Sequence, residues 1–370
     1  MKLLPATLTT FAMALALSAS ALAHKASDAY LQLRTEPAGL ELRLDVALRD
    51  LDATLDLDAD ADGRLTWGEV QRAWPAIVDY TTQRVHIDGC TLSPGAPGLE
   101  QRSDGAYAVL WLRSPCRPVG EPVIDYRLFR DVDATHRGIA RIDVAGAGPV
   151  VRVLDPAAVP RPSREAEPAS FVAEGVRHIL TGYDHVLFLL CLLLPAVMRR
   201  VPARDGAASG WQPVNTPWQA LLPVAGIVTA FTVAHSITLA LAALGGWTLP
   251  SSVIEPAIAA TIVLAALDNF WPLFRVRRGT VTFLFGLIHG FGFAGVLAEL
   301  ELPTAQFVWA LLQFNFGLEL GQLTIVGAAL GTLYFLRSSP RYPAWVIRGG
   351  SAAVMAMGGL WFLERTVHLT

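Results

Sequence analysis

Four histidines and several acidic residues fall inside long apolar segments of this chain, where ionisable side chains are costly and usually functional. The densest group is residues 177–185, which read RHILTGYDH. On a straight helix His178 and His185 would share a face but lie about 10.5 Å apart along the axis. A site shared by both therefore requires a break near Gly182 or ligands from other helices.

Imidazole and carboxylate groups together suit zinc, nickel, cobalt or iron, and a neutral histidine also relays protons. Because scattered polar groups in a membrane would each be costly, we expect the strongest candidates to converge between the first, second and fourth apolar segments. These candidate ligands of a transition metal are His178, Asp184, His185, His235 and His289. The alternative for a lone buried histidine is an ordinary hydrogen-bonded packing residue.

Four further polar residues are candidates for supporting this metal site: Glu255, Asp268, Asn315 and Glu319. Asp268 and Glu319 have an alternative explanation as hydrogen-bonding residues between helices. Glu255 directly precedes Pro256 near the end of its segment. The alternative to a role at the metal site is therefore that Glu255 lies at the boundary between membrane and water.

Residues 58–69 read DADADGRLTWGE and match the twelve-residue calcium loop of an EF-hand. The ligand positions hold Asp58, Asp60, Asp62, Arg64 (through its backbone carbonyl), Thr66 and Glu69. Gly63 stands where the loop turns sharply. A single loop of this kind favours a structural calcium ion over a calcium sensor, and the alternative to both is an acidic surface turn.

The chain has three cysteines, two of them in the N-terminal half. We expect Cys90 and Cys116 to form a disulfide, because an exported domain folds in an oxidising compartment. Cys191 lies in an apolar segment and is expected to pack as a small hydrophobic residue.

The N-terminal part reads as a secreted domain. Residues 1–23 have the positive start, apolar core and small-residue cleavage site of a signal peptide, so the mature chain would begin at His24. Whether His24 binds a metal ion is a question that the sequence leaves open. Residues 24–154 show the two-residue alternation of strands, with a helix expected over 67–83, and predict a β-rich domain as an antiparallel sheet or sandwich. Residues 155–170 are rich in proline and read as a linker.

The region 171–370 predicts a membrane bundle of six helices, because six long apolar segments follow one another. Arginines occur in the loops after the first, third and fifth segments, and the loops after the second and fourth contain no lysine or arginine. This alternation places the N-terminal domain and the C-terminus outside a bacterial inner membrane, on the periplasmic side. The chain is 53% hydrophobic, with a net charge of −3, which argues against nucleic acid as a partner.

Several motifs resemble one known family. His178-x5-Asp184-His185 with Gly182 resembles the signature of the HupE/UreJ family of hydrogenase and urease accessory membrane proteins, and Phe231-x3-His235-Ser236 is similar to a motif of nickel/cobalt transporters. Residues 286–294 (GLIHGFGFA) and 314–322 (FNFGLELGQ) resemble later helices of the branch that carries an exported N-terminal domain. The resemblance covers 171–363 and implies a nickel or cobalt permease.

The sequence thus favours a divalent transition-metal permease with a calcium-binding extracytoplasmic domain, whose partners are the metal ion and the lipid bilayer. One alternative is an assembly or sensor membrane protein that holds a metal or haem. Another is an intramembrane zinc hydrolase built from His235, Ser236, Asp268 and His289. Neither H-E-x-x-H nor G-x-S-x-G occurs in the sequence, so a transporter is favoured over an enzyme.

Overall fold

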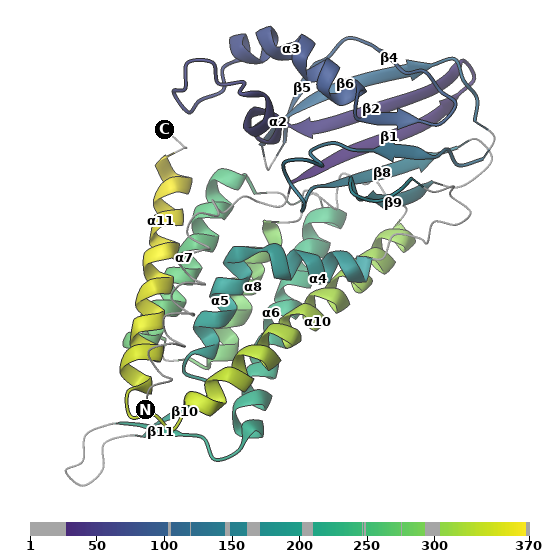
Figure 1. Cartoon of the computed structure of the whole chain (residues 1–370). Helices are drawn as coiled ribbons and strands as arrows, with labels where there is room; N and C mark the ends of the chain where they lie inside the picture. Colours follow the sequence, from purple (N-terminus) through teal and green to yellow (C-terminus); the bar gives the residue numbers. More distant parts are fainter. Residues whose placement is uncertain are drawn as a thin grey trace.

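The computed structural model describes residues 27–102, 105–118, 120–144, 149–160, 171–201, 210–245, 247, 249–274, 276–292 and 304–367. The expected signal peptide and His24 lie outside these residues, as does most of the expected linker. Figure 1 shows a strand region (residues 28–154) at one end of a helical region (residues 171–367). The prediction of a β-rich part followed by a helical part is confirmed at this level.

The strand region is built on one seven-stranded sheet in the order β4-β6-β2-β1-β8-β9, with β5 also paired to β6. Its strands are β1 (Asp28–Glu36), β2 (Gly39–Ala47), β4 (Ser93–Pro94), β5 (Gly98–Arg102), β6 (Gly105–Ser114), β8 (Arg137–Asp143) and β9 (Val150–Leu154). The expectation of an antiparallel sheet was wrong in one respect, because β1 and β8 run parallel. Strands β3 (Val85–Ile87) and β7 (Ile124–Tyr126) form a separate pair.

The two faces of the sheet pack against different partners. Leu31 and Leu33 of β1, like Leu42 and Leu44 of β2, face a core that includes residues of helices α2 (Leu48–Leu55) and α3 (Trp67–Thr82). Tyr30, offset by one residue, faces a second cluster shared with the helical region. A strand exposes alternate residues to its two faces, so β1 serves both clusters, and the sheet lies between helices rather than in a β-sandwich.

The loop 58–69 connects α2 to α3, and the sequence analysis did not predict α2. The α3 helix begins with a capping box in which Thr66 and Glu69 satisfy each other's backbone groups. Gly63 takes the left-handed conformation at φ 79°, which glycine adopts without penalty. Cys90 and Cys116 form the expected disulfide.

Within the described residues, four helices are long and apolar enough to cross a membrane, and five if the bent pair described next counts as one span. These are α6 (Pro217–Gly245), α7 (Ser251–Phe270), α10 (Thr304–Leu336) and α11 (Gly350–Val367), the last continuous with a π-helical turn over Pro343–Gly349. α8 (Arg278–Phe291) is shorter, and residues 293–303 after it lie outside the described part of the chain. The count of six therefore stays a prediction.

The first apolar segment is not one straight helix. It is divided into α4 (Phe171–Thr181) and α5 (Tyr183–Leu193), and the chain bends by 69° between the two helix axes. Figure 1 shows α4 lying across the bundle beneath the sheet, whereas α5 runs along it. A short hairpin of β10 (Met198–Val201) and β11 (Gly210–Pro213), absent from the sequence-based expectation, follows α5 at the far end of the bundle.

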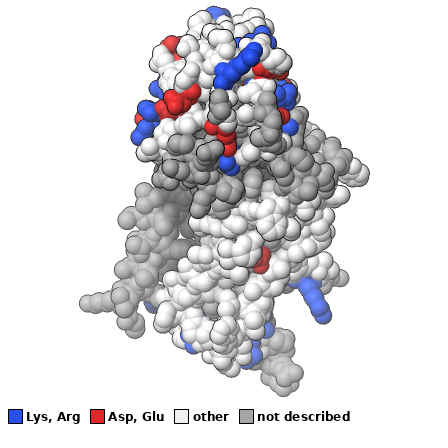
Figure 2. Space-filling model, turned by 90° about the vertical axis from the view of Figure 1, so that its right-hand side faces the viewer, with Lys and Arg blue, Asp and Glu red and all other residues white. Residues whose placement is uncertain are grey.

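Charge is distributed as a membrane protein requires. On the face shown in Figure 2, acidic and basic residues gather on the strand region, basic residues reappear near the opposite end, and the band between them is almost free of charge. Such a band suits contact with lipid tails.

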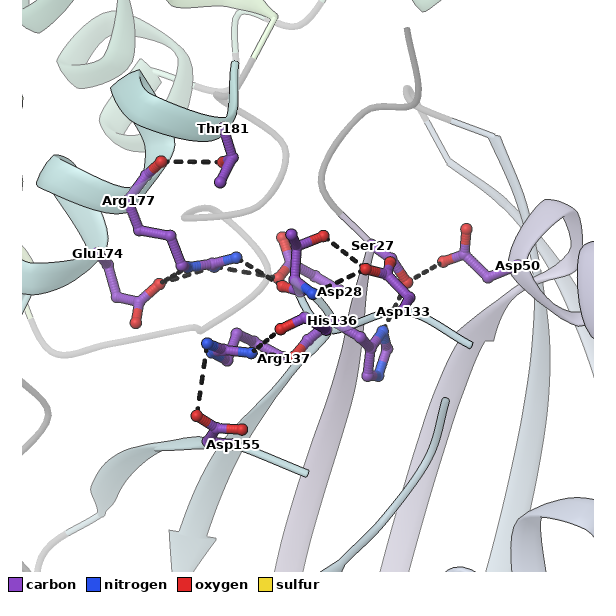
Figure 3. Close-up of polar contacts among 12 residues, drawn as sticks. Ser27, Asp28, Asp50, Asp133, His136, Arg137, Asp155, Glu174, Arg177 and Thr181 are labelled. Carbon is purple, nitrogen blue, oxygen red and sulfur yellow. Dashed lines mark hydrogen bonds and ion pairs between the residues drawn. The ribbon is translucent and has the colours of Figure 1, made fainter. Parts of the chain in front are cut away.

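A chain of buried polar groups lies where the strand region meets α4 (Figure 3). His136 is fully buried, with Nδ1 2.5 Å from Ser27 Oγ and Nε2 2.5 Å from the Tyr126 hydroxyl. Ser27 donates its own hydrogen to Asp50 at 2.8 Å. Since that leaves Ser27 Oγ as the acceptor, His136 Nδ1 carries the proton and Nε2 accepts from Tyr126. Burial lowers the pKa of His136 from 6.5 to about 3.

We predict that the free energy of unfolding falls as the pH drops from about 6.5 to about 3, by up to roughly 1.4 kcal/mol per pH unit from His136 alone. The unfolded chain binds a proton in this window whereas the folded chain does not, so acid favours unfolding. Thermal unfolding of the full chain in detergent across this pH range measures the effect.

His136→Gln keeps a donor and an acceptor but does not titrate, so its unfolding temperature should depend less on pH. His86→Gln, at an exposed histidine of β3, is the matched control and should leave the dependence unchanged. Equal pH dependence in both variants would show that His136 is not the responsible group.

Candidate metal centre

The break between α4 and α5 is centred on Gly182. This residue has φ −73° and ψ 89°, which is not helical. A Cβ atom built there would lie 2.7 Å from the His178 carbonyl oxygen and 2.9 Å from His185 Nδ1, so a side chain at this point would collide with both histidines. The bend brings the rings of His178 and His185 to 5.0 Å between centroids, far closer than on a straight helix.

His235 of α6 completes a group of three. One ring nitrogen from each of His178, His185 and His235 lies within 4.8 Å of the others. His235 is fully buried, and its ring centroid is 6.1 Å from each of the other two. Three imidazoles at this spacing match the donor set of many transition-metal sites. We name these three residues the histidine triangle.

His289 of α8 lies beside the triangle without being one of its corners. Its ring is 5.0 Å from that of His185, and its Nε2 is 2.9 Å from the Thr261 hydroxyl of α7. Thr261 also donates to the carbonyl of Ile258 at 2.6 Å. If the hydroxyl hydrogen is used there, His289 Nε2–H donates to Thr261 and Nδ1 carries the free lone pair.

Asp184 contacts the triangle through His185. Its Oδ1 accepts from the backbone N–H of His185 at 2.8 Å and lies 2.9 Å from His185 Nδ1. A carboxylate on one imidazole nitrogen fixes the tautomer and leaves the other nitrogen as a lone-pair donor. The structure therefore places Asp184 behind His185 rather than at a corner of the triangle.

Several ring nitrogens in this group are buried without a hydrogen-bond partner among the described residues. They are Nε2 of His185, both nitrogens of His235 and Nδ1 of His289. Buried polar atoms are normally paired, and each exception calls for an explanation such as an ion or water. A cation would satisfy one lone-pair nitrogen from each ring that it binds.

Aromatic rings close the site on the apolar side. Phe231 lies one turn before His235 in α6, and its ring is 5.2 Å from that of His289 and 6.0 Å from that of His185. Phe188 packs against His289 at 5.5 Å, and Phe314 packs against His178 at 5.4 Å. This shell lowers the local dielectric, which strengthens any ion–ligand interaction inside it.

α4 lies tightly against α10 through small residues on both helices. A Cβ on Gly175 would be 2.0 Å from the Phe314 carbonyl oxygen, and one on Gly317 would be 1.9 Å from the carbonyl oxygen of Val172. Small residues allow helix backbones to approach in membranes, where packing rather than the hydrophobic effect drives association. The contact fixes the position of His178, three residues after Gly175.

The strand region also holds α4, through Arg177 (Figure 3). The guanidinium donates to Glu174 at 2.7 Å within α4 and to the Thr135 carbonyl at 2.7 Å, and it lies 3.6 Å from Asp28 of β1. Arg177 directly precedes His178 in the chain. The strand region and the histidine triangle are thus joined by adjacent residues of one helix.

A family model described as HupE / UreJ protein matches residues 155–365. This chain belongs to the HupE/UreJ family. The match covers more than half of the 370 residues and confirms the resemblance on which the sequence analysis relied. The family is known for transport of nickel and cobalt. A comparison with curated proteins gave no match.

The four residues expected to support the metal site lie in different places in this HupE/UreJ protein. Glu319 accepts from Thr229 of α6 at 2.6 Å and so joins two helices, as the alternative explanation proposed. Asn315 donates to the Leu311 carbonyl in its own helix. Asp268 accepts from the backbone of Leu273 and pairs with Arg278 at the far end of the bundle, away from the histidines.

Glu255 lies in the first turns of α7, where its backbone carbonyl accepts from Arg365 at 3.1 Å. Sequence reasoning missed two participants, Thr261 beside His289 and Arg177 beside His178. Thr261 gave no signal, since a threonine in an apolar helix is common. Arg177 could have been found, because an arginine next to a membrane histidine needs a counter-charge.

In the loop 58–69, carboxylate oxygens of Asp58, Asp60 and Glu69 lie within 4.8 Å of one another. Asp62 instead accepts from the backbone of Arg64 at 2.8 Å. The Thr66 hydroxyl and backbone N–H, which donate to Glu69, lower the pKa of that carboxyl and keep it ionised. Clustered hard oxygen donors of this kind fit a calcium ion.

We predict that Gly175→Ala destabilises the protein by about 1–3 kcal/mol, because the added methyl group overpacks the contact with α10. Thermal unfolding in detergent measures the change. Gly327→Ala is the matched control, since a Cβ at Gly327 of α10 meets nothing within 4 Å. Equal unfolding temperatures for the two variants would contradict the close approach of α4 and α10.

Proposed function

We propose that this HupE/UreJ protein is a permease for a divalent transition metal of the nickel or cobalt type. The observation that carries the proposal is the histidine triangle, in which one ring nitrogen of each residue lies within 4.8 Å of the others. Nε2 of His185 and both nitrogens of His235 have no hydrogen-bond partner among the described residues. Asp184 and His289 belong to the same polar group, and the family is known for nickel and cobalt transport.

The donor set suits a passing ion. Neutral imidazoles bind borderline cations such as nickel and cobalt and discriminate against calcium and magnesium, which prefer oxygen. The triangle supplies three nitrogens, so an octahedral ion would keep other positions for water or for His289. Transport requires binding that is strong enough to admit the ion and weak enough to release it.

The metal would enter from the side of the strand region, through the surface where α4 meets the sheet. His178 follows Arg177, which contacts the strand region directly, so His178 is the first ligand along this route. The arginines in alternate loops support a periplasmic strand region and an inner-membrane bundle.

We predict that His185→Ala abolishes uptake of nickel or cobalt into proteoliposomes, because it removes a corner of the triangle and leaves Asp184 without its partner. Asp184→Asn should weaken metal binding about 10- to 100-fold, the usual cost of losing the group that orients a ligand. Metal-resolved uptake, with protein incorporation measured in parallel, tests both.

Cys191→Ala, in the same helix but packed among apolar side chains, is the control and should transport normally. Wild-type rates in His185→Ala vesicles that contain correctly inserted protein would exclude the triangle as the transport site.

We also propose that the loop 58–69 binds one structural calcium ion through Asp58, Asp60, Asp62, Thr66, Glu69 and the Arg64 carbonyl. Asp62 would turn from its bond with the Arg64 N–H toward the ion. Because the loop joins α2 to α3, which both pack on the sheet core, the ion would stabilise this side of the strand region.

We predict that millimolar calcium raises the unfolding temperature of the native chain, because a ligand that binds only the folded state stabilises it. Glu69→Gln should lose most of this shift, since it removes one charge and one arm of a bidentate ligand. Glu100→Gln, at an acidic residue of β5 away from the loop, is the control and should keep it. An unfolding temperature that does not respond to calcium would refute the assignment.

A further inference from the structure

A cavity of about 340 Å³ is lined in part by residues of β10 and β11, which lie at the end of the bundle opposite the strand region (Figure 1). It lies between the β10–β11 hairpin and the connection from α7 to α8, and the residues that decide its chemistry are Met198, Arg200, Trp211, Asp268, Phe274 and Arg278. We name it the basal cavity. None of these residues belongs to the histidine triangle or to the calcium loop.

Two guanidinium groups and one carboxylate give the basal cavity a net positive charge. Arg200 donates through Nη2 to the Asn269 carbonyl at 2.9 Å, and its guanidinium lies 4.9 Å from the Trp211 ring. Arg278 uses its own Nη2 for Asp268 at 3.3 Å and for the Asn269 side chain at 3.1 Å. A guanidinium has five N–H donors, and the bonds of each arginine to described residues use only Nη2, so each retains donors for a further acceptor.

The two arginines also affect one another. Burial and then the positive charge of Arg278 lower the pKa of Arg200. Two guanidinium groups that line the same cavity repel each other, and an anion bound between them relieves that repulsion. A metal cation would instead add to it, so the basal cavity is not suited to the transported ion.

The surroundings favour an anion that carries an apolar part. Asp268 stands two residues before the end of α7, a helix long enough to cross the membrane, so the basal cavity lies at the boundary between lipid tails and water. Met198, Phe274 and the Trp211 ring supply apolar surface beside the guanidinium groups. Basic pockets between membrane helices with this composition bind phospholipid head groups.

We propose that the basal cavity binds a phosphate ester carried by the head group of an anionic phospholipid. Arg200 and Arg278 would donate to the phosphate oxygens, and the acyl chains would lie along the ends of α5 and α7. The lipid would thereby tie the β10–β11 hairpin to the α7–α8 connection. This inference does not depend on metal transport.

Native mass spectrometry of the full chain in neutral detergent tests the proposal, with phosphatidylglycerol and phosphatidylcholine compared at equal concentrations. We expect phosphatidylglycerol to bind more tightly. The double variant Arg200→Gln with Arg278→Gln should bind it roughly 10- to 30-fold more weakly, from the loss of two guanidinium contacts. Glycerol 3-phosphate and inorganic phosphate form separate arms that contain the phosphate without acyl chains.

Each cavity arginine has a neighbour that serves as its control. Arg199 and Arg277 are exposed and do not line the cavity, so Arg199→Gln with Arg277→Gln removes the same charge from the same end of the molecule. This control should keep phosphatidylglycerol affinity. Equal losses in the two double variants would overturn the site and indicate nonspecific attraction to a basic surface.

A charge change of opposite sign gives an independent test. Asp268→Asn removes the carboxylate from the basal cavity and should strengthen phosphatidylglycerol binding, and unchanged or weaker binding would overturn the proposal even if the arginine variant failed to fold. Equal binding of the two phospholipids by the unaltered chain would overturn it as well. Binding of inorganic phosphate or glycerol 3-phosphate as tight as that of the lipid would overturn the lipid as the source of the phosphate.

Discussion

Buried imidazole nitrogens are costly to leave without partners, and those of His185, His235 and His289 that have none among the described residues lie in one place. His178, His185 and His235 face one another across the bend at Gly182, and His289 stands next to them. A single cation would bind one lone-pair nitrogen from each of several of these rings, which scattered histidines would not permit. Much of the surrounding architecture serves to hold this arrangement: the break between α4 and α5, the glycine contact with α10, the phenylalanine shell and the carboxylate of Asp184 behind His185.

The strand region is part of the same arrangement. Its sheet packs one face on α2 and α3 and presents the other to the helices through Tyr30 and Tyr107. Arg177, the residue of α4 that precedes His178, contacts Asp28 at the start of β1. A displacement of the sheet would therefore act on α4, and through α4 on the first ligand of the proposed route. This mechanical connection gives the strand region a physical means to influence the proposed transport.

The two ends of the molecule differ in charge and in chemistry. The end that carries the sheet has acidic and basic residues, and its loop 58–69 gathers carboxylates that suit a cation. The opposite end presents arginines, and two of them line the basal cavity. Between these ends, the face shown in Figure 2 is almost uncharged. A protein with this polarity would attract a divalent cation on one side and bind anionic head groups on the other.

The sequence by itself determined the features that depend on local pattern: the alternation of the strands, the apolar helices, the acidic loop, the cysteine pair and the histidine motif that marks the family. It also required either a break at Gly182 or ligands from other helices, because His178 and His185 lie two helical turns apart. Only the tertiary structure decided that the helix breaks at Gly182, that His235 of α6 completes the triangle, that Asp184 lies behind His185, and that Asp268 lies at the other end of the bundle. It also decided that β1 pairs in parallel with β8 and that Arg177 reaches Asp28. These facts depend on contacts between residues far apart in the chain, and no periodicity within one segment encodes the position of another.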